Sequence, residues 1–263
     1  MSESLDIRRL LEKWPYDPED DIRIVNGDDG RELLQVRTPV GIEQLEMKGR
    51  PDGARPHDKE SALEFQLQRL EESRKAGLTA EFELDPEDCA ELFAEGTLYY
   101  FRYVRLLQLK RWADTLRDTS RNLRLFDLMH EYAQQEEDRN HLEKWRPYII
   151  RMNAIASALM SLEKGAHDNA VEIVEKAIAR IEAIEDLDDE TFAFERSRSV
   201  EALHELEDQI NRTRPLSTLE RLEQQLTRAI DRQEFERAVE LRDRIRSLKG
   251  QQQPGKPARD RKS

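Results

Sequence analysis

The sequence predicts a mainly helical α+β protein with three parts: a small N-terminal antiparallel β meander, a central helical array and a C-terminal helical hairpin. Three observations support this fold class. Short runs of alternating apolar and polar residues are concentrated in residues 1–57. Apolar residues at steps of three and four follow through residues 58–212. The same steps recur in two final stripes within residues 217–248, around a short polar turn.

The first 57 residues are expected to form a short helix and three strands. The helix, Leu5 to Lys13, ends before Trp14-Pro15. The expected strands are residues 22–25, 33–37 and 42–47. Residues 26–30, Asn-Gly-Asp-Asp-Gly, are typical of a plain hairpin turn. So few strands are rarely stable in isolation, and we therefore expect the meander to pack against the helices that follow it.

Residues 58–212 are predicted to form a series of helices. Asp85-Pro86 combines an N-cap with a first-turn proline, and Gly77 is suited to end the helix before it. The expected helices are residues 58–76, 85–94, 98–110, 114–133, 147–164, 167–185 and 191–211. Arg214-Pro215 separates this array from the hairpin.

One helix pair, around residues 150–182, resembles a tetratricopeptide repeat. Small or packing residues stand at the offsets that the repeat uses: Ala158, Gly165, Ala170, Val174 and Ala177. Ala154 and Ser161 occupy the positions where that repeat has tryptophan and tyrosine. The resemblance implies repeat-like packing with a concave protein-binding face. An ordinary helix bundle accounts for the same residues and stays open as the alternative.

The composition argues for long charged helices and against several classes of function. The 263 residues carry a formal net charge of −13, which opposes general binding to nucleic acid or to acidic membranes. One cysteine, Cys89, cannot form an intrachain disulfide. The sequence has no charged-then-apolar leader and no long apolar run, so we expect a cytoplasmic protein that does not enter a membrane.

Residues 217–248 predict two short amphipathic helices. Ser217 can cap the first helix, with Glu220 completing a capping box. The first apolar stripe is Leu219, Leu222, Leu226, Ala229 and Ile230, and after the turn of residues 231–234 the second is Phe235, Ala238, Leu241, Ile245 and Leu248. Phe235 is placed to fill the gap beneath the turn. A lone pair of four-turn helices is marginal, so the hairpin is expected to pack on a second copy, another protein or the body of the chain.

The hairpin carries a family resemblance. Leu222-Glu223, Ala229 and the run FERAVELRDRI at residues 235–245 resemble the UVR domain, also called the UvrB/UvrC motif. Its usual core is D-F-E-x-A-A-x-L-R-D-x-I; here Glu234 replaces the first acidic residue and Val239 the second alanine. The resemblance covers about an eighth of the chain. It implies a hairpin that pairs with a like hairpin, as between two excision-repair subunits, and the module also occurs in Clp-protease-associated regulators. The predicted partner-binding residues are Leu222, Leu226, Ala229, Phe235, Glu236, Ala238, Leu241, Arg242, Asp243 and Ile245.

Catalytic and metal-binding patterns are scarce. The five histidines show no metal-ligand spacing, and Cys89 has no paired histidine signature nearby. No phosphate-binding loop of the G-x-x-x-x-G-K-[ST] type occurs, so the helicase of the first repair subunit is absent. We therefore expect no catalytic residue, no metal and no cofactor.

One stretch points toward nucleic acid. Residues 99–124 interleave aromatic residues with seven basic ones, against Asp114 and Asp118. Such residues can stack on and clamp a strand, but they can equally form helix core with arginines paired to acidic neighbours. The net charge favours the second interpretation, so specific nucleic-acid binding is not expected.

Together these patterns favour a non-catalytic scaffold or adaptor that binds a protein partner, or itself, through residues 217–248. Two alternatives stay open: a DNA-repair accessory that contacts nucleic acid through residues 99–124, and an unrecognised enzyme built on the meander. The last residues, 251–263, contain no apolar side chain larger than alanine and are expected to be a disordered basic tail.

Overall fold

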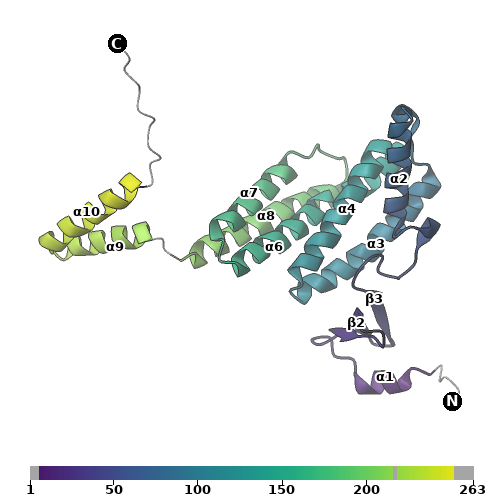
Figure 1. The fold of residues 1–263 in the computed structure, drawn as a ribbon, viewed down its shortest axis with the longest axis horizontal. Helices are drawn as coiled ribbons and strands as arrows, with labels where there is room; N and C mark the ends of the chain where they lie inside the picture. Colours follow the sequence, from purple (N-terminus) through teal and green to yellow (C-terminus); the bar gives the residue numbers. More distant parts are fainter. Residues whose placement is uncertain (1–5, 216–217, 252–263) are drawn as a thin grey trace, which may run out of the picture. The chain divides into compact units, whose positions relative to one another are not determined.

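The computed structural model describes residues 6–215 and 218–251, which divide into two compact units. The first unit ends at Asn211 and the second begins at Arg212. The mainly helical α+β class predicted from the sequence is confirmed (Figure 1). Among the described residues, no helix combines the length and the apolar character needed to cross a bilayer.

Three antiparallel strands follow the short helix α1 (Arg8–Lys13), as the alternating pattern predicts. They are β1 (Ile22–Asn26), β2 (Glu32–Thr38) and β3 (Gly41–Glu46), paired in the order β1-β2-β3. Leu34 on the central strand stands opposite Ile24 on one side and Leu45 on the other. Residues directly opposite each other share a face of the sheet, so these three side chains form one apolar surface.

This apolar surface of the sheet packs on the C-terminal end of helix α3 (Pro86–Gln108). Leu34, Met47 and Leu106 form a shared buried cluster. The fully buried guanidinium of Arg102 lies beside it and donates hydrogen bonds to the carbonyl oxygens of Glu46 (2.7 Å) and Gly49 (2.8 Å). The expectation that the meander packs against the helices is therefore confirmed.

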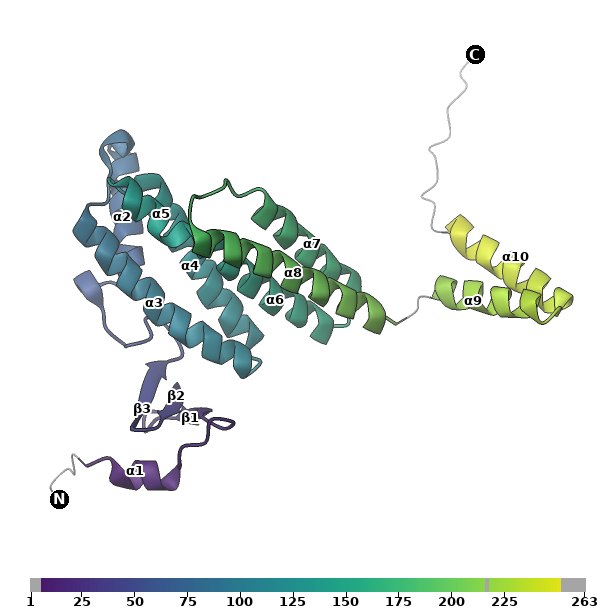
Figure 2. The ribbon, with the colours of Figure 1, turned by 180° about the vertical axis from the view of Figure 1, so that it is seen from behind.

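The rest of the first unit is a helical body with one continuous apolar core. Besides α3 it contains α2 (Ala62–Lys75), α4 (Trp112–Tyr132), α5 (Glu136–Glu143), α6 (Arg146–Glu163), α7 (His167–Glu182) and α8 (Glu190–Thr213). Two short 3-10 turns, Pro56–Asp58 and Thr79–Glu81, flank α2. Seen from behind, α8 runs along this body next to α6 and α7 (Figure 2).

Two helix predictions in the body were wrong. Residues 85–94 and 98–110 form one helix, α3, because Gly96 lies inside it rather than in a break. Asn122 of α4 donates a hydrogen bond to the Gly96 carbonyl (2.9 Å), and a Cβ at Gly96 would lie 3.7 Å from Leu125, so the glycine stands where two helices pack closely. Helix α5 was not predicted, because its sequence is mostly charged and contains one buried apolar residue, Leu142, which gives no helical periodicity.

Helices α6 and α7 pack side by side around small residues, as their sequence predicts. Ala158 and Ala170 are fully buried between helices of the body. Gly165 joins the two helices with φ +71°, and the N–H of Ala166 donates to the carbonyl of Ser161 (2.9 Å), the long bond of a Schellman motif. The structure shows the close packing of the pair, whereas its membership of the tetratricopeptide repeats is not confirmed.

Candidate functional site

The C-terminal unit is a hairpin of two helices, α9 (Thr218–Asp231) and α10 (Phe235–Gln251), which confirms the predicted hairpin. Four side chains are buried between the helices: Leu222, Ala229, Leu241 and Ile245. Four more are partly buried against them: Leu219, Leu226, Ala238 and Leu248. Eight of the ten residues in the two predicted stripes thus form the hairpin's own core. The proposed cap Ser217 and residues 252–263 of the predicted tail lie outside the described residues, whereas Gln251, predicted to begin the tail, is the last residue of α10.

The turn between the helices is a Schellman motif built without glycine. Gln233 adopts φ +60°, and the N–H of Glu234 donates to the carbonyl of Ala229 (2.8 Å) while the N–H of Gln233 donates to that of Ile230 (2.9 Å). Because the backbones of Ala229 and Glu234 are hydrogen-bonded, the residues that follow each of them are brought close together. Ile230 and Phe235 therefore lie at the same end of the hairpin.

Charged side chains hold the hairpin at its other end. The Lys249 ammonium of α10 lies 2.8 Å from the Glu223 carboxylate of α9, and this ion pair joins the two helices. A second ion pair links Arg214, before α9, to Glu220 in its first turn. These pairs are partly exposed, so each contributes at most about 1 kcal/mol. The register of the two helices is set mainly by the buried apolar residues.

Three large apolar side chains stay exposed at the turn end of the hairpin. Ile230 is 53%, Phe235 68% and Val239 47% exposed. Phe235 and Val239 are one helical turn apart on α10, so they share a face. We call Ile230, Phe235 and Val239 the turn-end patch. The expectation that Phe235 fills a gap beneath the turn, and that Ile230 belongs to the seam, was wrong: both side chains point to the outside, and Ala229 fills the seam at that level.

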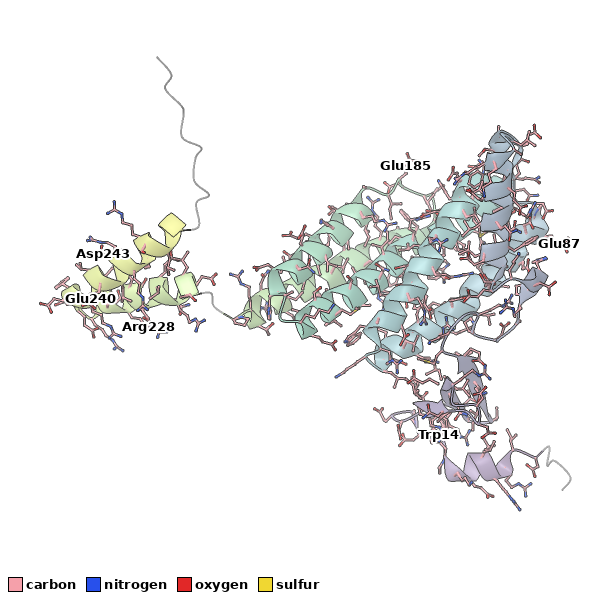
Figure 3. The ribbon with its side chains drawn as sticks, viewed as in Figure 1. Trp14, Glu87, Glu185, Arg228, Glu240 and Asp243 are labelled. Atoms are coloured by element: carbon pink, nitrogen blue, oxygen red, sulfur yellow. The ribbon has the colours of Figure 1, made fainter. Side chains whose placement is uncertain are left out.

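The ten predicted partner-binding residues thus separate into two groups. Leu222, Leu226, Ala229, Ala238, Leu241 and Ile245 lie buried or partly buried in the hairpin and hold it together. Phe235, Glu236, Arg242 and Asp243 are exposed and are free of that core. Figure 3 shows charged side chains such as Glu240 and Asp243 projecting from α10. The sequence analysis did not predict Ile230 and Val239 as surface residues. The excess of apolar positions next to the turn was the sequence feature that could have indicated an exposed apolar patch.

The aromatic and basic stretch 99–124 is largely engaged in contacts within the first unit. Tyr99 and Tyr103 are buried, and the guanidinium of Arg102 makes a two-pronged contact with Asp118 (2.6 and 2.8 Å). Further ion pairs join Arg111 to Glu32 and Asp114, Arg117 to Asp114 and Asp118, Arg121 to Glu95, and Arg124 to Glu64. These arginines form ion pairs within the first unit. The contacts therefore favour the interpretation of this stretch as helix core with paired arginines over its interpretation as a nucleic-acid surface.

The single thiol is poorly placed for chemistry. Cys89 is 2% exposed in the core, and burial raises the pKa of its thiol to about 12. Since the thiolate is the nucleophilic form, this cysteine is inert at neutral pH. Among the residues that the structure describes, no group of three or more His, Cys, Asp or Glu side chains is arranged to hold a metal ion.

Comparison with known proteins agrees with the hairpin geometry. The family model of the UvrB/uvrC motif, abbreviated UVR, matches residues 217–251. The resemblance of the C-terminal unit to a UVR domain is therefore confirmed, over the two helices α9 and α10. A search of the curated proteins gives no match for this chain. A search of the solved structures gives none either.

Proposed function

We propose that this chain is a non-catalytic interaction protein whose UVR hairpin pairs with another helical hairpin, in a partner protein or in a second copy. One observation carries the proposal: the turn-end patch leaves Ile230, Phe235 and Val239 exposed together on a small unit. Exposed apolar clusters of this kind are typical of interaction surfaces. The UVR match at residues 217–251 supports the same role, because that resemblance implies pairing between like hairpins.

The thin core of the hairpin gives a physical reason for pairing. Only Leu222, Ala229, Leu241 and Ile245 are buried among its described side chains, which is little apolar area for two helices of this length. Docking a second hairpin on the turn-end patch would remove Phe235 and Val239 from water. The apolar area buried in this way stabilises both the complex and the hairpin fold. The arginines and carboxylates around the patch then supply a polar rim.

The test removes two of the three side chains of the turn-end patch and leaves the hairpin core intact. In the full chain, Phe235→Ala combined with Val239→Ala should weaken association by about tenfold or more, because a large aromatic anchor is lost. Helix content and thermal unfolding should change little, since both side chains are mostly exposed. Light scattering over a concentration series measures self-association, and affinity capture from the native cell measures partner binding.

Arg244→Ala is the matched control, because Arg244 is an exposed residue of the same helix outside the patch. It should leave both measurements unchanged. Association and capture that survive in the double variant as in the unaltered chain would refute the proposal.

A further inference from the structure

A cavity of about 350 Å³ opens in the helical body among residues of α3, α4, α6 and α8. Its walls are mainly aromatic, from Phe93, Tyr100, Phe126, Trp145 and Tyr148. Phe93, Tyr100 and Trp145 remain 38–41% exposed, so the cavity opens to solvent. Its volume lies in the range of small-molecule sites, which are typically apolar with a few polar groups.

One of these polar groups is an unsatisfied buried carboxylate. Glu195 of α8 lines the cavity and is 5% exposed, yet no described group donates a hydrogen bond to its Oε2. The nearest guanidinium nitrogens are Nη2 of Arg151, 3.8 Å from Oε2, and Nη1 of Arg198, 3.7 Å from Oε1. Both distances exceed the range of an N–H···O hydrogen bond. A buried acceptor without a donor is costly. Because the Glu195 carboxylate that carries it lines the cavity, a ligand that donates to this carboxylate offsets part of that cost.

The cavity also presents a positive charge. Arg198 lines it, and with its side chain 59% exposed this residue has room to reorient. Arg151 pairs with Glu195 at 3.8 Å but does not line the cavity: its guanidinium lies over the Tyr148 ring, 5.1 Å from the centroid, and donates to the carbonyl of Arg198 (3.4 Å). The charged groups that line the cavity are therefore one carboxylate and one guanidinium. A ligand that matches both carries a donor cation and an acceptor anion on an apolar body.

We propose that this cavity binds a free amino acid with an aromatic side chain. The α-ammonium group donates to Glu195, the α-carboxylate accepts from Arg198, and the ring lies among Phe93, Tyr100 and Trp145. The weak contact between Glu195 and Arg198 is replaced by one charge-assisted hydrogen bond from each of these two side chains to the ligand. A simple amine would satisfy Glu195 and leave Arg198 unused, and a simple acid would do the reverse.

The experiment titrates the full chain by calorimetry with L-phenylalanine and three truncated relatives. Phenethylamine lacks the carboxylate, phenylpropionate lacks the ammonium group, and L-alanine lacks the ring. L-phenylalanine should bind saturably, and each truncated compound should bind about tenfold more weakly or worse, as expected for a lost charged hydrogen bond or lost apolar contact.

Two variants separate the charged contacts. Glu195→Gln should weaken L-phenylalanine and phenethylamine but spare phenylpropionate, whereas Arg198→Gln should weaken L-phenylalanine and phenylpropionate but spare phenethylamine. Glu201→Gln, at an exposed site on the same helix, should change nothing. The proposal is overturned if L-phenylalanine does not bind, if it binds no better than L-alanine, or if either variant binds it as the unaltered chain does. Because Arg198 is exposed, its variant keeps the test decisive even where Glu195→Gln impairs folding.

Discussion

Replacing Arg102 with methionine should destabilise the first unit by about 3–5 kcal/mol, the range for breaking a buried ion pair. The Arg102 guanidinium is fully buried and makes four short contacts: two with the Asp118 carboxylate and one each with the Glu46 and Gly49 carbonyls. Methionine fills much of the same space but donates no hydrogen bond. The loss is limited because Nε of Arg117 still donates to Oδ1 of Asp118 (2.9 Å).

Urea unfolding followed by tryptophan fluorescence measures this loss in the right part of the chain. All three tryptophans, Trp14, Trp112 and Trp145, lie in the first unit, so the signal reports that unit and not the hairpin. The matched control is Arg124→Met, which removes a surface pair with Glu64 at 3.8 Å and should cost no more than about 1 kcal/mol.

A double variant identifies the source of the loss. If Asp118 is destabilising once its partner is gone, Arg102→Met together with Asp118→Leu should recover at least part of the stability lost by Arg102→Met alone. A single-variant loss as small as that of Arg124→Met would refute the argument that this guanidinium connects the sheet to α3 and α4.

Two further predictions concern the helix pairs. Ala170 is fully buried where α7 packs, so Ala170→Glu should bury an unpaired charge, cost several kcal/mol and lower the thermal midpoint; an unmoved midpoint would contradict this packing. Gln233 has φ +60° at an exposed turn, so Gln233→Gly should relieve the left-handed strain and stabilise the hairpin by about 1 kcal/mol, measured as slower amide exchange in α9 and α10. Equal or faster exchange would count against the strain argument.

The sequence was most informative where side-chain periodicity alone determines structure. The strands around Leu34 and the hairpin seam through Leu222 and Ile245 were predicted, because each buries one regular face. The break predicted between residues 94 and 98 was wrong, although glycine usually marks a break: Gly96 lies inside α3 and faces Leu125 of α4. The burial of Gly96 depends on this second helix, more than twenty residues away in the sequence.

The candidate site was predicted only in part for a similar reason. A stripe of apolar residues does not show whether its end residues are buried between the helices or exposed. Ile230 and Phe235 lie at the two sides of the turn, and both are exposed. The contacts that define the aromatic cavity are even harder to predict from the sequence. Glu195 on α8 meets Tyr100 on α3 only through tertiary packing, and no spacing along the chain indicates it.

The thin core of the hairpin also affects how long this segment survives in a cell. The described hairpin exposes arginines at residues 221, 228, 232, 237, 242, 244 and 246, and each is a cleavage point for a trypsin-like protease once the hairpin opens. Proteolysis of a rapidly opening segment follows the population of its open form. A partner that binds the closed hairpin lowers that population by mass action. If a partner binds the hairpin as proposed, the lifetime of this segment depends on the concentration of that partner, and chains without it are cleaved in their C-terminal unit first.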